Sequence, residues 1–159
     1  MRPFLFVSLV LLGFGFQPLH SATSATATAT FTIATINAIS VTGNPAAFNI
    51  NAAVAGSPPT NVTDISTTYA VTTNATSQRI QGSIDTGMPT GVTLSINLTA
   101  PTGGTSAGAV SMTTTAQNLV TGISNVAQSG LQICYTVSAT PSASPAAATT
   151  RTVTYTIGP

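Results

Sequence analysis

The chain has 159 residues, of which 43% are hydrophobic and only 3% are charged, and its formal net charge is +1. Beyond the N-terminal region the only cationic side chains are Arg79 and Arg151, too few to neutralise the phosphates of a nucleic acid or to hold an anionic membrane surface. Disorder requires low hydrophobicity as well as polarity. The composition therefore excludes these two kinds of partner and predicts a chain that buries a core.

The N-terminus has the layout of a secretory signal peptide. Arg2 precedes an apolar run over residues 4–16, and a polar break leads to small residues. The run is shorter than the roughly 20 apolar residues of a membrane-spanning helix. We expect cleavage after Ala22, or as late as Ala25, so residues 1–22 form the signal peptide. The mature chain is then a secreted single domain with no membrane insertion after cleavage.

The next segment, SATSATATATFTI over residues 21–33, alternates small or apolar residues with threonine. This period of two predicts a β-strand. One face of the strand carries Ala25, Ala27, Ala29, Phe31 and Ile33. The alternation is satisfied whether the strand pairs within its own chain or completes the sheet of a neighbour, and we favour the neighbour. Residues 23–35 are therefore expected to form an N-terminal extension, and residues 36–159 the folded domain.

Alternation of period two continues to the end of the chain. The first alternating segment runs on to Val41, and further strands are expected over residues 48–54, 65–71, 80–84, 92–98, 110–112, 131–137 and 153–157. Residues 119–126 fit either a strand or one helical turn. Gly82 interrupts its strand and marks a bulge or a point of close packing. Seven to nine short strands separated by turns predict an all-β fold, a single antiparallel β-sandwich.

Few residues could carry chemistry. Asp85-Thr86-Gly87 matches the aspartic protease tripeptide, but an Asp-x-Gly sequence between two strands also forms a turn, and we favour the turn. The mature chain has no histidine or lysine to activate a nucleophile. Its carboxylate side chains, Asp64 and Asp85, have no spacing typical of a glycosidase or a calcium loop. We therefore expect no enzyme activity, no cofactor and no metal.

Cys134 is the single cysteine. It lies on the face of the expected strand 131–137 opposite Ile133 and Tyr135, and alone it forms no internal disulfide. Two interpretations stay open. The thiol is either buried, as free cysteines commonly are, or it forms a disulfide between subunits.

Both ends of the chain share features with one class of proteins. The Thr/Ala alternation directly after the signal region and the terminal TVTYTI, residues 152–157, resemble secreted bacterial surface-fibre subunits, including fimbrial pilins and the spore-coat-U-like group. The resemblance implies an immunoglobulin-like sandwich whose N-terminal extension completes the sheet of a neighbouring subunit. It implies a non-enzymatic structural subunit of a cell-surface fibre, pilus or coat, assembling with copies of itself or with related subunits. The alternative is a monomeric secreted adhesion module whose loops contact a glycan or a protein.

Overall fold

The computed structural model describes residues 24–159. The chain consists of two compact units, Met1–Ile33 and Ala34–Pro159. The expected signal peptide, residues 1–22, lies outside the described residues, as does position 23. Within residues 24–159 no helix is long and apolar enough to cross a membrane.

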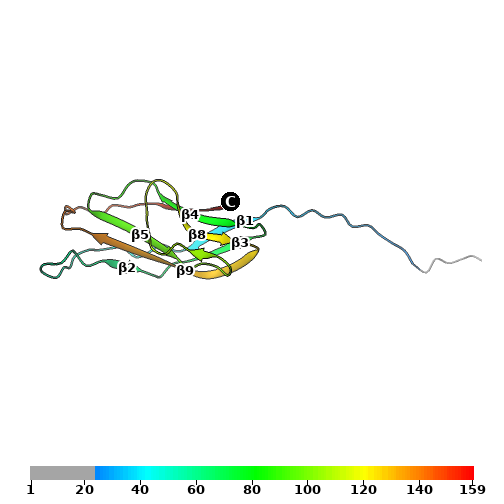
Figure 1. The fold of residues 1–159 in the computed structure, drawn as a ribbon, viewed down its shortest axis with the longest axis horizontal. Helices are drawn as coiled ribbons and strands as arrows, with labels where there is room; N and C mark the ends of the chain where they lie inside the picture. The colour runs from blue at the N-terminus through cyan, green and yellow to red at the C-terminus, as the bar shows by residue number, and fades with distance from the viewer. Residues whose placement is uncertain (1–23) are drawn as a thin grey trace, which may run out of the picture. The chain divides into compact units, whose positions relative to one another are not determined.

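Ala34–Pro159 is built from strands, and residues 24–159 contain no helix, which confirms the all-β prediction (Figure 1). The strands are β1 (Asn37–Thr42), β2 (Val62–Asp64), β3 (Thr68–Thr73), β4 (Gln78–Ile84), β5 (Val92–Leu98), β6 (Thr105–Ser106), β7 (Val110–Ser111), β8 (Gln117–Ile123), β9 (Val126–Ala139) and β10 (Val153–Gly158). They form two antiparallel sheets that pack as a β-sandwich.

The two sheets differ in size, and they contact each other at one edge through β1 and β10. One sheet has the order β1-β3-β9-β5-β7, with β2 also paired to the long strand β9, and the other has the order β10-β4-β8-β6. β1 and β10 are therefore edge strands, and they contact each other. Figure 1 shows the C-terminus, at the end of β10, beside β1. The opposite edges, β6 and β7, are only two residues long.

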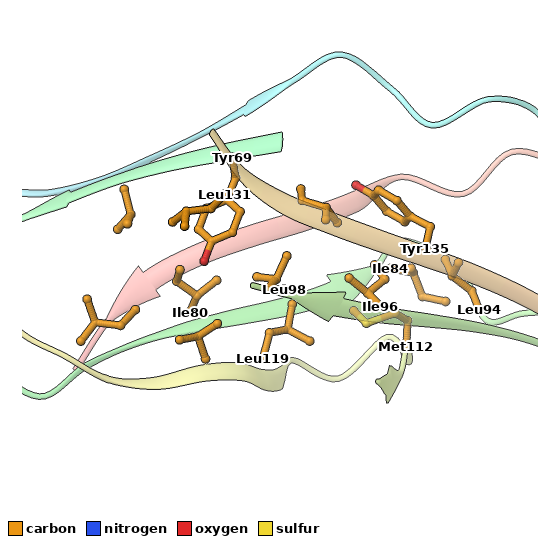
Figure 2. Packing of buried hydrophobic residues seen from close by; sticks show 14 of the residues in the cluster. Tyr69, Ile80, Ile84, Leu94, Ile96, Leu98, Met112, Leu119, Leu131 and Tyr135 are labelled. Atoms are coloured by element: carbon orange, nitrogen blue, oxygen red, sulfur yellow. The ribbon is translucent and has the colours of Figure 1, made fainter. Parts of the chain in front are cut away.

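Side chains from the inner faces of both sheets fill the interior (Figure 2). Ile80 and Leu119 from one sheet and Ile96 and Ile133 from the other are fully buried. Each such side chain contributes roughly 1.5–3 kcal/mol when it is removed from water. The alternating residues of the sequence thus form a continuous apolar core between the sheets.

Gly82 is a point of close packing, as predicted. A Cβ atom at this position would lie 2.7 Å from Leu119 Cδ1 and 3.0 Å from Met112 Cε. The β4–β8 ladder also shifts register nearby, between Ile80 and Gln81. The absence of a side chain at Gly82 therefore allows β8 and the loop after β7 to approach β4.

Two expected strands are not formed. Residues 24–36 have no regular secondary structure, so the expected strand over 25–33 is not formed. The strand expected over 48–54 is wrong, because only an isolated bridge between Ala53 and Pro59 forms there. Phe48 and Ile50 still pack against the core. Alternation brings their side chains inward, but no described strand pairs with this segment, so no continuous ladder forms.

The ambiguous segment 119–126 is resolved as strand and turn. β8 continues to Ile123, and β9 begins at Val126 after a reversal in which Asn125 has a positive φ of 46°. Asparagine tolerates this left-handed conformation better than most residues. Leu119, Val120 and Ile123 are all buried as parts of the strand.

Thr67 is an unfavourable residue in the interior. Its Oγ1 is buried with no hydrogen-bond partner among the described residues, although its carbonyl accepts a bond of 3.0 Å from Ile133 N. Leaving a buried hydroxyl unpaired costs about 1–3 kcal/mol. We therefore expect Thr67→Val to raise the free energy of unfolding by about 1 kcal/mol, as measured by urea denaturation.

The matched control for this prediction is Thr73→Val, the same substitution at another buried threonine. Thr73 Oγ1 donates a hydrogen bond to Asn37 Oδ1 (2.7 Å) and accepts one from Ala75 N (3.0 Å). Loss of the Thr73 hydroxyl, and with it both hydrogen bonds, should lower the free energy of unfolding by about 1–3 kcal/mol. Equal destabilisation by both substitutions would contradict the prediction for Thr67.

Candidate assembly site: the open edges of the sandwich

The core is incompletely covered along β1 and β10. Val153 and Ile157 of β10 pair with Ile84 and Ile80 of β4, so their side chains share the inward face of the sheet. The two β4 side chains are almost fully buried, whereas those of β10 are only half-buried. On β1 the inward-facing Val41 is 38% exposed. Apolar side chains that point toward the core therefore remain accessible on this side.

The backbone of β10 has one free edge. Asp85 N donates a hydrogen bond of 3.1 Å to Thr152 O, one step beyond the β10–β4 ladder. In an antiparallel ladder every second residue directs its N–H and C=O toward the partner strand. The backbone groups of Val153, Tyr155 and Ile157 consequently point away from β4, where no other described strand pairs with β10.

β1 has a free edge for the same reason. Asn74 N donates a hydrogen bond of 3.3 Å to Ile36 O, just before the first pair of the β1–β3 ladder. By alternation, the backbone groups of Asn37, Ile39 and Val41 point away from β3. The open side of the sandwich thus offers apolar side chains together with unused backbone donors and acceptors.

Neither edge has the usual protection against pairing. Natural sheets block their edges with charged residues, proline, bulges or very short strands. β6 and β7 follow this rule by being short, but β1 (NAISVT) and β10 (VTYTIG) are six residues long and contain no charge and no proline. We refer to these two strands as the open edges. They have the properties of edges that accept a strand from another chain.

No family model, curated protein or solved structure matches this chain. Sequence reasoning did not identify the free edge at Val153, Tyr155 and Ile157. The available signal was the uncharged, alternating TVTYTI at the end of the chain.

Tyrosine hydroxyls link the open edge to the interior. Tyr155 OH donates a hydrogen bond of 3.0 Å to Tyr135 OH across the two sheets. Burial, together with this hydrogen bond, raises the pKa of Tyr155 above its ordinary value. Tyr69 OH donates to Thr99 O at 2.6 Å, and burial raises the pKa of Tyr69 from 10.0 to about 12.

These pKa shifts predict a loss of stability in alkali. Because the folded state holds the tyrosine protons more tightly than the unfolded state, their contribution is fully present below pH 10. It is lost as the pH rises through 10 toward 12. The chain contains no lysine that would titrate in the same range. We expect the urea midpoint to fall over this range, and to fall less steeply in Tyr69→Phe. If the urea midpoint fell equally steeply with pH in both proteins, the loss of stability could not be assigned to ionisation of Tyr69.

The expected donor residues are accessible. Ala25, Ala27, Ala29, Phe31 and Ile33 all belong to the described part of the first unit and are exposed. Phe31 is 83% exposed and Ile33 is 75% exposed, the largest exposed fractions among the large hydrophobic side chains of residues 24–159. Two large apolar side chains on one face of an alternating segment are thus exposed among the described residues.

Cys134 is partly buried, and the interpretation as a buried thiol stays a prediction. It lies on β9 opposite Asn97 of β5 and does not form a disulfide within the chain. Its neighbours Ile133 and Tyr135 face the core, so Cys134 belongs to the outer face of the sheet. A disulfide between subunits stays a prediction.

Asp85 forms a turn. Its Oδ1 accepts hydrogen bonds from Thr86 N (2.8 Å) and Thr152 N (3.0 Å), so the carboxylate connects the end of β4 to the start of β10. Arg151 Nε and Nη2 donate to Gly87 O in the same turn. The Asp85 tripeptide therefore connects β4 to β10 through hydrogen bonds.

Asp64 has a comparable role at the end of β2. It accepts hydrogen bonds from Ser66 Oγ (2.7 Å) and Ser66 N (3.0 Å), and these bonds lower the pKa of its carboxyl group. Over residues 24–159 no group of three histidine, cysteine, aspartate or glutamate side chains is placed to hold a metal ion. The described acidic side chains are thus engaged locally with backbone and hydroxyl groups.

Proposed function

We propose that this protein is a secreted, non-enzymatic structural subunit that forms a cell-surface fibre, pilus or coat by β-strand complementation. In each contact, residues 25–33 of one copy add to the free edge of β10 in the next copy, and β1 forms the opposite wall. The observation that carries the proposal is the pair of uncharged, six-residue open edges with half-buried core-facing side chains. The immunoglobulin-like character of the sandwich and its export through the signal peptide over residues 1–22 are parts of the same proposal.

The extension and the open edge complement each other chemically. Phe31 and Ile33 are two positions apart, the same spacing as that of Val153, Tyr155 and Ile157. An added strand gains a row of backbone hydrogen bonds, and its alternate side chains fix the register. Burial of Phe31 and Ile33 would contribute roughly 1.5–3 kcal/mol each. The small side chains at Ala25, Ala27 and Ala29 would require little space.

Electrostatics favours a partner of the same sequence. The extension over residues 24–33 and both open edges contain no charged residue, so copies of the chain do not repel one another at the contact. Thr28, Thr30 and Thr32 would form the hydrated outer face of the added strand, for which threonine is well suited. We therefore assign a homopolymer as the principal assembly.

Sedimentation of the purified mature chain over a concentration series, with electron microscopy of the same samples, tests the proposal. The expected result is concentration-dependent formation of linear polymers of uniform width. A chain that stays monomeric at every concentration would overturn the proposal and favour the monomeric adhesion module instead.

A further inference from the structure

The outer face of the larger sheet carries hydroxyl groups in a row that runs across its strands. Each member pairs with the next, and the row consists of Thr63 on β2, Thr136 on β9, Ser95 on β5 and Ser111 on β7. Residues that are directly paired on neighbouring strands share one face of the sheet. Ile96, the neighbour of Ser95 on β5, is fully buried in the core, so the row lies on the outside. Thr63 Oγ1 and Thr136 Oγ1 are hydrogen-bonded to each other at 3.2 Å.

A second row crosses the other half of the same sheet. It consists of Thr42 on β1, Thr68 on β3 and Gln132 on β9. These side chains point outward, because Tyr69 and Leu131, one residue away on β3 and β9, are buried. We call the two rows together the hydroxyl face.

The hydroxyl face contains no charged side chain. The charged residues of the described chain are Asp64, Arg79, Asp85 and Arg151. Asp64 pairs with the core-facing Tyr135 and so belongs to the other side of β2. Arg79 is exposed on β4, in the smaller sheet, and the remaining two lie at the connection between β4 and β10. Among the described residues, the hydroxyl face is therefore a sheet surface at which copies of the chain do not repel one another.

Two copies of this face complement each other. A hydroxyl group both donates and accepts hydrogen bonds, so a surface of hydroxyls fits a second surface of the same kind, whereas a charged surface requires a partner of opposite charge. Twisted sheets also pack face to face with their strands about 30° apart. The hydroxyl face is thus suited to a second copy of the chain.

The area of the face indicates a weak contact. The larger sheet has the strand order β1-β3-β9-β5-β7. With strands about 4.8 Å apart and about seven residues long, it offers at most roughly 500 Å² on each copy. Two copies together would bury about 1,000 Å², the lower end of specific interfaces. A single contact of this size is weak, but a polymer repeats it along its length, and repeated contacts strengthen one another.

We propose that the hydroxyl face is a lateral contact through which one polymer of this chain associates with the hydroxyl face of a second polymer. The inference rests on the proposed function for the existence of the polymer. The contact is separate from the open edges, because Thr136 and Ser95 lie on β9 and β5, in the middle of the larger sheet. A strand added to β10 extends the smaller sheet and leaves the hydroxyl face uncovered.

The test places one positive charge on each outer face. Thr136→Lys changes the hydroxyl face, and Thr121→Lys changes an exposed threonine of β8 in the smaller sheet. Electron microscopy measures the mass per unit length of the polymers, and sedimentation measures the concentration of half-maximal assembly. We expect the mass per unit length to fall at least twofold in Thr136→Lys, because the added charges repel each other, while the assembly concentration changes less than twofold. Thr121→Lys should match the unaltered chain in both quantities.

Salt separates repulsion from a structural defect. Because salt screens charges, the mass per unit length of Thr136→Lys should return to that of the unaltered chain at high salt. If Thr136→Lys lowers the urea midpoint of the subunit, Ser95→Lys in the same row takes its place. Equal mass per unit length in the unaltered chain and both variants would overturn the lateral contact and leave the proposed function intact.

A further measurement needs no polymer. The chain with Phe31→Thr and Ile33→Thr lacks the donor side chains, and its amide chemical shifts are followed as its concentration is raised to the millimolar range. If the unaltered chain never assembles, the proposed function fails, and these shifts then decide: changes at Thr63, Ser95 and Thr136 support the contact, and their absence overturns it. Changes at the same residues caused only by dextran, a neutral polysaccharide, would also overturn it and assign the face to the adhesion module.

Discussion

Replacing Phe31 and Ile33 together by threonine should abolish assembly at concentrations where the unaltered chain is polymeric. Both side chains are exposed in the single chain, at 83% and 75%, so the free energy of unfolding of the subunit should not change. The contact would lose roughly 3–6 kcal/mol of apolar burial, which corresponds to an increase of about 10²- to 10⁴-fold in the assembly concentration. Threonine preserves the strand propensity of the segment, so the loss reports on side-chain burial.

Sedimentation measures the assembly concentration, and urea denaturation of the dilute chain measures subunit stability. The control is Val54→Thr, which removes a 70% exposed apolar side chain outside the extension and outside the open edges. Assembly of the double variant at the same concentration as the control would show that Phe31 and Ile33 do not fill the edge of a neighbour.

The interior strands could be predicted from the sequence because both requirements of a strand are met there. In the segments 80–84, 92–98 and 131–137, alternation places large apolar residues on one face, and the fold supplies neighbouring strands on both sides. The same alternation over residues 48–54 gave a wrong prediction. A sequence pattern shows that a segment has a face to bury, but it does not show that a partner strand is available.

The extension illustrates the same limit in a more informative way. Its alternation is as regular as that of the interior strands, yet residues 24–36 have no regular secondary structure. The open edges were beyond sequence reasoning, because the position of a strand in a sheet depends on topology. Asn74 was visible only as the start of a turn, since its bonds to Ala34 and Ile36 connect positions about 40 residues apart. Such long-range contacts depend on the register in which β1 pairs with β3.

Placing a charge on the open side should block assembly from the accepting end. Val41 faces inward on β1 but is 38% exposed, so a lysine there can extend its ammonium group into water while its stem stays on the apolar surface. The subunit should therefore remain folded in Val41→Lys. A strand added beside β10 would cover this ammonium group against the wall formed by β1, and a charge at a sheet edge opposes such addition. We expect no polymer, whereas Val54→Lys, with the same change of charge, should assemble normally.

A mixture of the two assembly-deficient proteins provides the sharpest test. Val41→Lys keeps an intact extension but has a blocked edge, and the Phe31→Thr, Ile33→Thr protein keeps an open edge but has a weak extension. Neither should assemble alone. When they are mixed, one extension and one edge remain competent, so the expected product is a dimer with one copy of each and no larger species. Light scattering after size separation measures its mass.

The composition of the product separates directional strand addition from other modes of association. If the extensions associated with each other, Val41→Lys would assemble on its own, because every copy of that protein has an intact extension. If association used another apolar surface, such as exposed Val54 and Ile65, neither variant would be defective and both would form polymers alone. Only addition of the extension of one copy to the edge of another gives two inactive proteins and a mixture that stops at the dimer.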